Sequence, residues 1–584
     1  MAIVPSATLL SWPRRSKLFI SRIALLTAIT LPLAAQLTPE QKAIDFQTIA
    51  SAYAKQYAPY EWKRDNLGFD LFDLRPWMER IRASKDDLAY LEIVNEYVAK
   101  LNDVHSYYIL NSDFSADLHL FTDIYDGKLL IESIDRNHLP ARTFDFAVGD
   151  EILQIDGRPV AQVIDEIGKL NSFANARSTR RWAADFVTYR TQIAQPRAAE
   201  LGKSATLLIR KADGTEKSYT IDWEKDGTPI TKLGPLPNFR FARAADKHSD
   251  EEEVIGEEVP SWKKPWIKLQ NNVARPSKHL RGFHARDPIF RLPANFQQRL
   301  GRSRADFYYS GTWTAEGKRI GFIRVGTFDL GSFGVVNSAL RQFQTEIAFM
   351  QANTDVLIVD ITRNGGGFGC YAEGMLGYLM TRNFQVFGLE YRPTLFDVLA
   401  WRDAYQGALD FGSADEQQLY AALLKDIEAA YSENRGRTGT MPFCQDGLEA
   451  APARDRNGAP LSYTKPILLL TDEFTASAGD MFAALVQDNK RGKIFGYRTA
   501  GAGGSTIQFE AGFYSEGAVS MTPTMLVRPE MRSAPGFPAS RYIENVGVTP
   551  DIVYDYQTRD NLINNGADFV AAFTKAALDH LAGN

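Results

Sequence analysis

The feature that most constrains the fold is a repeated alternation of strand-like and helix-like segments in the second half of the chain. Strands are expected at 319–328, 355–361, 467–470 and 493–496, and helices at 335–351, 369–380 and 476–488. Strands that alternate with helices along the sequence are typical of an α/β domain. We therefore predict such a domain from about residue 305 onward.

Two long segments do not follow this alternation. Residues 227–303 are rich in proline, basic and acidic residues and include the run DEEE at 250–253. We interpret them as an insertion or linker with a solvated, charged face. Residues 383–462 interrupt the α/β pattern as a second insertion.

The first half of the chain divides into a helical and a strand-rich section. Residues 37–112 are expected to be helical, because LAYLEIVNEYVAKL (88–101) has the apolar spacing of an amphipathic helix. The following FAVGDEILQIDGRPV (146–160) reads as a strand between two tight turns, with a helix at 160–170 and a pair of strands within 205–223.

Length and charge set broad limits. A chain of 584 residues is expected to form two to four domains. The net charge of −5 gives no electrostatic reason to expect a nucleic-acid partner. Self-association into a homo-oligomer stays open.

The N-terminus has the pattern of a secretory signal. Basic residues at 14, 15, 17 and 22 precede the apolar stretch IALLTAITLPLAA (23–35), which ends in small residues. We predict cleavage near Gln36, no stable membrane span afterwards, and a periplasmic, cell-envelope or extracellular location. The alternatives are an uncleaved membrane anchor and, on the weak Arg14-Arg15 match, twin-arginine export.

The cysteines and histidines show no metal-site spacing in the sequence. The two cysteines, Cys370 and Cys444, are compatible with a disulfide or with two buried thiols. None of the seven histidines falls in an H-E-x-x-H arrangement. We expect no metal catalysis.

Ser477 has two interpretations from local chemistry. It follows an expected strand within TDEFTASAGDMF (471–482), so it is either an ordinary helix N-cap or a nucleophile at a helix start. The glycine run Gly365-Gly366-Gly367 also follows a strand and lets backbone N–H groups approach an oxyanion. It is not a P-loop, and Ser477 lacks the first glycine of a G-x-S-x-G elbow.

Taken in order, four segments resemble the tail-specific (C-terminal-processing) serine protease superfamily. They are FAVGDEILQIDGRPV, similar to the PDZ domain of these proteases; VLIVDITRNGGG, with Thr362 where arginine is usual; the Ser477 segment; and IENVGVTPDI at 543–552. The resemblance implies an α/β fold with a crotonase-like catalytic core, a PDZ-like domain and a helical N-terminal region. The expected boundaries are 1–35 signal peptide, 36–115 helical region, 116–226 PDZ-like domain, 227–303 insertion or linker, and 304–584 protease core with the insertion 383–462.

One departure bears on the catalytic base. The Ser–Lys branch of the superfamily has a lysine where this chain has Ala502, while Lys490 and Lys493 read as surface charges. The other branch, which includes tricorn protease and the chlamydial protease-like activity factor, uses histidine and glutamate. Its motifs match LNDVHS at His105 and ENVGVTPD at Glu544.

The resemblance therefore implies a secreted serine endopeptidase that acts on a protein or peptide substrate without a cofactor. Ser477 is the expected nucleophile, His105 the base and Glu544 the third member of the triad, with Asp551 and Asp480 as alternatives to Glu544. The oxyanion donors are expected to be the N–H groups of Ala478 and of Gly365 or Gly366.

Two rival functions stay open: a catalytically silent binding protein for peptides or apolar ligands on the same scaffold, and a Ser–Lys protease that uses Lys490 or Lys493. The PDZ-like domain either binds a substrate C-terminus or acts as a spacer or gate. A zymogen in which one of the two insertions blocks the cleft is a further alternative.

Overall fold

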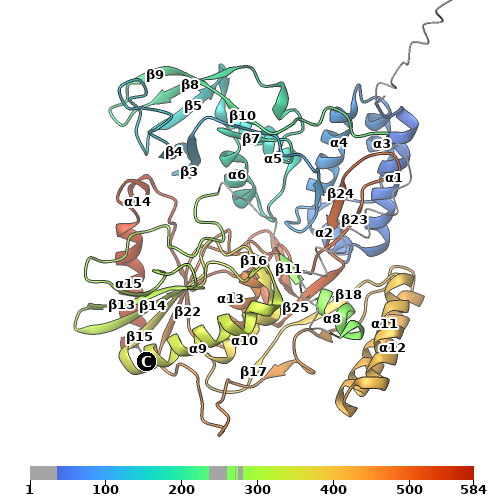
Figure 1. The fold of residues 1–584 in the computed structure, drawn as a ribbon, viewed down its shortest axis with the longest axis vertical. Helices are drawn as coiled ribbons and strands as arrows, with labels where there is room; N and C mark the ends of the chain where they lie inside the picture. The colour runs from blue at the N-terminus through green and yellow to red at the C-terminus, as the bar shows by residue number, and fades with distance from the viewer. Residues whose placement is uncertain (1–35, 236–259, 270, 274–279, 584) are drawn as a thin grey trace, which may run out of the picture.

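We describe the protein from a computed structural model that defines residues 36–235, 260–269, 271–273 and 280–583 (Figure 1). The expected signal segment at 1–35 and the acidic run at 250–253 lie outside these ranges. Within them, no helix is both long enough and apolar enough to cross a lipid bilayer.

The predicted α/β domain is built on a seven-stranded sheet in the lower half of Figure 1. Its strands from β14 to β27 run parallel. In spatial order they are β12 (Gln297–Leu300), β13 (Tyr309–Ala315), β14 (Lys318–Arg324), β15 (Val356–Asp360), β21 (Ile467–Thr471), β22 (Lys493–Gly496) and β27 (Ile552–Val553).

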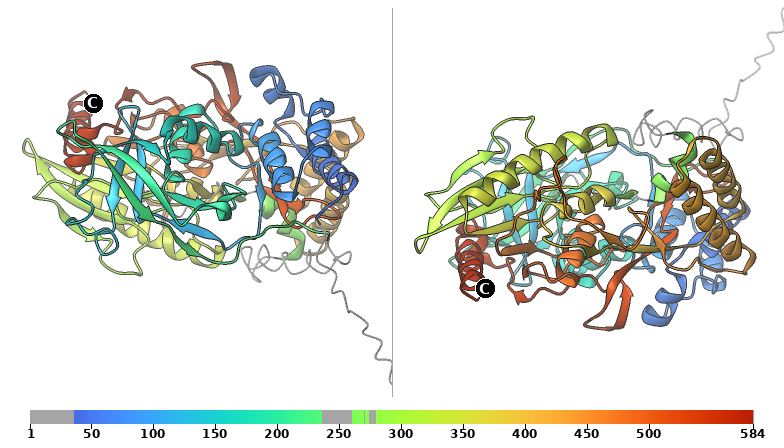
Figure 2. Two further views of the ribbon diagram at one scale, coloured as in Figure 1. Left: turned by 90° about the horizontal axis from the view of Figure 1, so that it is seen from above. Right: turned by 90° about the horizontal axis from the view of Figure 1, so that it is seen from below.

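Helices cover both faces of this sheet (Figure 2). One face carries α9 (Val336–Asn353), α10 (Gly369–Gly377) and α13 (Ala478–Asp488), and the other carries α15 (Ala567–Ala582). Successive residues of β15 alternate between the two cores: Leu357 packs with the first group and Ile358 with the second. Both faces are buried, as expected for a parallel sheet.

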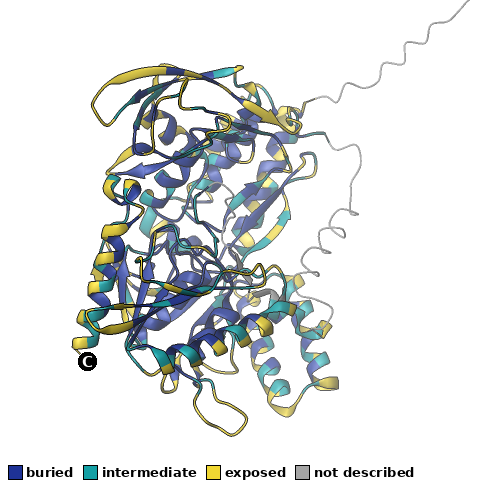
Figure 3. Cartoon of the chain, turned by 60° about the vertical axis from the view of Figure 1, so that its left-hand side comes forward, coloured by how far each residue is buried: buried dark blue, intermediate teal, exposed yellow. Residues whose placement is uncertain are grey.

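A second sheet and a helical hairpin extend the α/β domain. The sheet order is β19 (Met441–Pro442), β18 (Gly388–Tyr391), β25 (Thr524–Ala534) and β26 (Phe537–Tyr542). The hairpin, α11 (Leu395–Phe411) and α12 (Ala414–Ser432), begins each helix with a capping box, at Thr394 and Ser413. The second predicted insertion therefore contains regular structure, whose outer faces are exposed (Figure 3).

The strand-rich section forms a separate sheet with the order β3-β4-β5-β8-β9. The strands are β3 (Leu120–Tyr125), β4 (Lys128–Ile134), β5 (Glu151–Ile155), β8 (Ser204–Arg210) and β9 (Glu216–Asp222), and they pack with α5 (Val160–Leu170) and α6 (Ala176–Asp185). A three-stranded sheet of β10 (Glu224–Asp226), β2 (Ser115–Asp117) and β7 (Tyr189–Thr191) adjoins them.

The N-terminal helices are shorter than predicted. They are α1 (Pro39–Gln56), α2 (Tyr60–Leu67), α3 (Arg75–Arg82) and α4 (Asp87–Ala99), so helix ends at residue 99 rather than near 112. Strand β1 (Tyr107–Ile109) follows and pairs with β24 (Ala518–Met521), which also pairs with β23 (Ile507–Glu510). This long-range pairing anchors the residues between α4 and β1 to the C-terminal half of the chain.

The two cysteines form a disulfide. Cys370 lies in α10 and Cys444 in the second insertion, with their Cα atoms 5.2 Å apart. Of the two alternatives that the sequence left open, the structure has the disulfide. It fastens the insertion to the buried core around α10.

Replacing both cysteines by serine is expected to lower the free energy of unfolding by about 2–4 kcal/mol, because the disulfide closes a long loop in the unfolded chain. Urea denaturation with and without dithiothreitol measures the effect. The double variant should not respond to dithiothreitol, whereas the unaltered protein should lose the same stability when reduced. An unaltered protein whose two thiols become titratable without any loss of stability would contradict this expectation.

Candidate active site

Ser477 lies at the tight turn between β21 and α13. It is fully buried and takes a φ of 56° and ψ of −118°, which a non-glycine residue adopts only where its surroundings impose it. The Asp480 carboxylate holds Ser477 in this conformation, because the carboxylate accepts the N–H groups of Ser477 (3.0 Å) and Ala502 (2.9 Å). Burial raises the pKa of Asp480 to about 6, although these hydrogen bonds act to lower it. Ser477 thus occupies the N-cap position in a strained turn.

His105 reaches Ser477 from the turn between α4 and β1. Its Nε2 lies 3.1 Å from Ser477 Oγ, although the two residues are 372 positions apart. The turn is held by Asp103, whose Oδ1 accepts the His105 N–H at 2.9 Å. Its Oδ2 accepts hydrogen bonds from the hydroxyls of Tyr57, Ser106 and Thr522. The structure therefore brings the predicted nucleophile and base into hydrogen-bonding contact.

The His105 imidazole is held neutral. Complete burial lowers its pKa to about 4; the Asp103 carboxylate opposes this and the Lys63 ammonium adds to it. A neutral imidazole at ordinary pH can accept the proton of a serine hydroxyl.

Glu544 lies in the same buried cluster but bonds to other groups. One oxygen forms a short ion pair with Lys63 Nζ, and the other accepts the Gly503 N–H at 2.8 Å. Burial raises the pKa of Glu544 to about 7, opposed by Lys63 and aided by Asp103. Within the described ranges, His105 Nδ1 has no hydrogen-bond partner. The structure therefore places Glu544 in the cluster without joining it to His105.

Lys63 was not anticipated from the sequence. It lies in α2 and is completely buried, where its ammonium also donates to Asn545 Oδ1 (2.7 Å) and to the Asn102 carbonyl (3.1 Å). The surrounding sequence YEWKRDNL looks like an exposed polar helix. Its burial is explained by acceptors distant in the sequence, Asn102, Glu544 and Asn545.

The alternatives to Glu544 make other contacts. Asp480 holds the Ser477 turn, and Asp551 is exposed, where it accepts the Ile494 N–H at 2.8 Å and lies 3.6 Å from Lys493. Lys490 is exposed and the Lys493 side chain is half exposed, as expected of surface charges.

Asn364 ties the glycine run to the nucleophile turn. Its side chain accepts the Gly366 N–H and donates to the Val325 carbonyl, both at 2.9 Å. Its own carbonyl accepts the Ala476 N–H at 2.9 Å. The residue next to Ser477 is thus held directly against the loop that carries the candidate oxyanion donors.

These contacts distinguish between the predicted donors. The N–H of Gly366 is already donated to Asn364, and that of Ser477 to Asp480. Of the two predicted glycines, Gly365 is therefore the better second oxyanion donor beside Ala478, the first residue of α13. An oxyanion there would also face the positive end of this helix.

Thr362, which stands where the resemblance expects arginine, is itself bound by an arginine from another strand. Arg324 donates to the Thr362 carbonyl (3.0 Å) and hydroxyl (3.1 Å) and pairs with Asp360 (2.8 Å). The departure from the family pattern is accommodated within the buried sheet.

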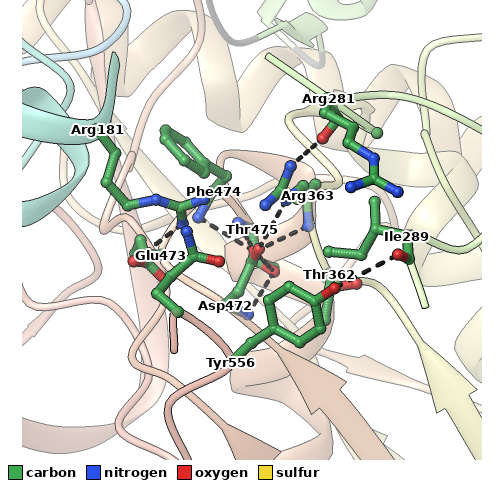
Figure 4. A network of polar contacts seen from close by, with 12 residues as sticks. Arg181, Arg281, Ile289, Thr362, Arg363, Asp472, Glu473, Phe474, Thr475 and Tyr556 are labelled. Atoms are coloured by element: carbon green, nitrogen blue, oxygen red, sulfur yellow. Dashed lines mark hydrogen bonds and ion pairs between the residues drawn. The ribbon is translucent and has the colours of Figure 1, made fainter. Parts of the chain in front are cut away.

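Figure 4 shows a buried network of polar contacts around Arg363 and Asp472. The Arg363 N–H donates to Asp472 Oδ1 at 2.8 Å, and Arg181 of α6 lies 3.0 Å from Glu473. Arg181 also donates to Asp123 of β3 at 3.0 Å. The network therefore joins the β3–β9 sheet to the turn that precedes Ser477.

Gly365 packs against a second histidine that the sequence did not indicate. A Cβ at position 365 would lie 2.2 Å from His284 Nε2 and 2.4 Å from Phe283 Cζ. His284 is fixed in turn, because its N–H donates to the Arg363 carbonyl (3.0 Å) and its Nδ1 lies 2.8 Å from Thr327 Oγ1.

Replacing Gly365 by alanine is therefore expected to lower kcat by about 10²–10³-fold, the usual effect of losing one oxyanion donor. The added methyl group must displace the loop or the histidine. Gly439→Ala is the matched control, since a Cβ there would meet nothing within 4 Å. Steady-state kinetics with a peptide substrate measure the effect, and a Gly365→Ala protein as active as the control would remove Gly365 from the site.

A strand from the first insertion lies along the glycine run. Strand β11 (Asn271–Val273) pairs antiparallel with β16 (Gly366–Phe368), with Val273 opposite Gly366. The backbone edge of β16 is therefore occupied by the chain itself.

Comparisons with known proteins agree with this architecture. Residues 319–554 match the model of peptidase family S41, and residues 121–230 match a PDZ domain model. A protein of Chlamydia pneumoniae is 24% identical over 617 aligned residues, which cover 96% of this chain and 93% of the relative. A protein of Chlamydia trachomatis serovar D is 25% identical and covers 86% of this chain and 87% of the relative.

The fold is similar to that of mature CPAF, solved in complex with lactacystin. The TM-score is 0.71 at 20% identity, and the match covers 94% of this chain and 99% of that one. The chain thus has a mixed α/β fold with a PDZ domain and a peptidase S41 domain.

Proposed function

We propose that this chain, a serine-type peptidase with an S41 domain, hydrolyses peptide bonds of protein substrates through an acyl-enzyme on Ser477. The observation that carries the proposal is the 3.1 Å contact between Ser477 Oγ and His105 Nε2 at the start of α13. A hydroxyl becomes a nucleophile when an adjacent base takes its proton.

In the proposed reaction, His105 accepts the Ser477 proton while Oγ bonds to the carbonyl carbon. The resulting oxyanion is held by the N–H groups of Ala478 and Gly365. When the C–N bond breaks, the His105 imidazolium gives its proton to the leaving amine. Water then attacks the ester, gives its proton to His105 and releases the carboxylate product, and His105 returns the proton to Ser477.

We assign Glu544 as the carboxylate that stabilises the imidazolium. What supports this is its complete burial in the cluster of Lys63 and Asp103, both of which act on His105 electrostatically. Lys63 and Gly503 hold the carboxylate in place, and His105 Nδ1 has no hydrogen-bond partner within the described residues.

This role predicts that kcat/KM falls at different acidic pH values in the unaltered protein and in Glu544→Gln. The kcat/KM of the unaltered protein is expected to fall as pH drops through about 7, where Glu544 takes up a proton and loses its charge. In Glu544→Gln the plateau should be lower, and the limb should move toward pH 4, where His105 itself protonates. A pH–rate profile, with circular dichroism confirming the fold at each pH, measures this shift. An unchanged limb in Glu544→Gln would show that another group titrates.

Labelling with a fluorophosphonate probe and hydrolysis of casein test the peptidase function. Because β11 covers the edge of β16, both the intact chain and a chain nicked within 227–303 should be assayed. We expect labelling and cleavage that Ser477→Ala abolishes. The rival function, a silent binding protein, requires that neither form reacts although both are folded.

Export is part of the proposal and rests on the sequence pattern of residues 1–35. Mass spectrometry of the mature protein should find an N-terminus near Gln36. The PDZ domain is proposed to add a substrate segment as a strand to its sheet.

A further inference from the structure

Two histidines and two carboxylates meet at one corner of the PDZ domain. His119 lies between β2 and β3, Asp135 and His138 lie in the turn after β4, and Glu224 begins β10. Candidate ligand atoms of His119, Asp135 and His138 all lie within 4.8 Å of one another. This corner makes no contact that the proposed hydrolysis uses.

Both histidines lie near the same carboxylate oxygen. Glu224 Oε2 lies 2.7 Å from His119 Nε2 and 3.8 Å from His138 Nε2. The two rings are stacked in parallel, with centroids 3.8 Å apart and an interplanar angle of 4°. The other nitrogen of His138, Nδ1, lies 2.8 Å from Asp135 Oδ2.

We propose that this corner binds a divalent transition-metal ion of the zinc type, with His119 Nε2, His138 Nε2 and a Glu224 oxygen as protein ligands. Two imidazoles and a carboxylate are a donor set that Zn²⁺ binds well. Asp135 then holds His138 Nδ1–H, so that Nε2 carries the lone pair, as the outer carboxylate of a histidine ligand commonly does.

The backbone is arranged for this cluster independently of any ion. His119 takes a φ of 62°, its N–H donates to Asp117 Oδ1 at 2.6 Å, and its carbonyl accepts the Asp135 N–H at 2.9 Å. In the described part of the chain, the ion pairs of Asp135 and Glu224 are made with these two histidines. A cation therefore has no arginine or lysine to displace.

One rearrangement is required. The in-plane lone pairs of two parallel rings do not point at one ion, so one ring must turn when an ion binds. His138 is free to turn because its side chain is 50% exposed, whereas that of His119 is 16% exposed. Binding would tie three separate chain segments together, including β10, which leads into the 227–303 segment.

Isothermal titration of the metal-free full chain, without an affinity tag, with ZnCl₂ tests the proposal. We expect one ion per chain with a micromolar dissociation constant, an increase in Tm, and no response to MgCl₂. His119→Ala and His138→Ala should each weaken binding at least tenfold, and Asp135→Asn by about 10–100-fold.

His580→Ala, in α15, is the matched histidine control and should bind zinc like the unaltered protein. Cobalt substitution should give the visible absorption of a tetrahedral site. Absence of heat and of any Tm shift at millimolar zinc would overturn the proposal, as would full binding by the His119→Ala/His138→Ala protein. Since neither readout needs peptidase activity, the result is independent of the proposed hydrolysis.

Discussion

Substitution of Ser477 by alanine, of His105 by alanine, and of both together is expected to leave the same residual peptidase activity, at least about 10⁴-fold below that of the unaltered protein. The reason is that Ser477 Oγ and His105 Nε2 act as one unit across their 3.1 Å contact. Once one of the two residues is lost, removing the other does not lower the activity further. The residual rate comes from substrate binding and the oxyanion donors, which the substitutions leave in place.

The measurement is kcat/KM for one peptide substrate with all three variants, together with the rate of fluorophosphonate labelling. Labelling should vanish in both Ser477 variants and become very slow in His105→Ala. Because His105 is fully buried, His105→Gln is added to separate a lost base from a packing defect. Ser432→Ala and His580→Ala serve as controls away from the site. Additive losses in the double variant would show that the two residues do not work together.

The α/β core follows from the sequence because its signals are local. The helix expected at 335–351 corresponds to α9 at Val336–Asn353, and the strand expected at 467–470 lies within β21. Each element there has apolar residues at the period its own geometry requires, and neighbouring elements bury the same residues. The agreement between local pattern and burial makes these elements predictable.

In the N-terminal region, local sequence patterns do not predict where the helix ends or that strand β1 follows. The predicted helix stops at Ala99, because Asn102 takes a φ of 47° and Asp103 binds the turn that carries His105. Strand β1 exists through its pairing with β24, more than 400 residues later. Pairing over that distance leaves no periodic trace near residue 107.

The candidate active site likewise has residues that the sequence predicts and residues that it does not. Ser477, His105, Glu544 and the glycine run could be predicted from ordered motifs, but the groups that hold them could not. His284 lies within the 227–303 segment, and its role depends on Gly365 packing against its ring. The histidine–carboxylate corner of the PDZ domain draws on residues from 119 to 224, with no metal-ligand spacing in the sequence.

Replacing Lys63 by methionine is expected to lower the free energy of unfolding by about 3–5 kcal/mol near pH 8, because it leaves the Glu544 carboxylate buried without its cation. Urea denaturation measures the loss. Lys490→Met, at an exposed lysine, is the control and should change stability by less than about 0.5 kcal/mol. The double variant Lys63→Met/Glu544→Leu should recover most of the stability, since no buried charge is left, while its peptidase activity stays low.

The pH dependence of this loss separates a broken ion pair from a packing defect. Without Lys63, the pKa of Glu544 in the folded protein should rise above the value of about 7 that it has beside the ammonium. The folded state then binds a proton that the unfolded state, with an ordinary glutamate pKa near 4.5, releases. Stability of Lys63→Met should therefore fall as pH rises from about 4.5 through the raised pKa, and its deficit should be smaller at pH 5 than at pH 8. A deficit that is the same at both pH values would mean that methionine only packs poorly at this position, and that Glu544 does not depend on Lys63 for its charge.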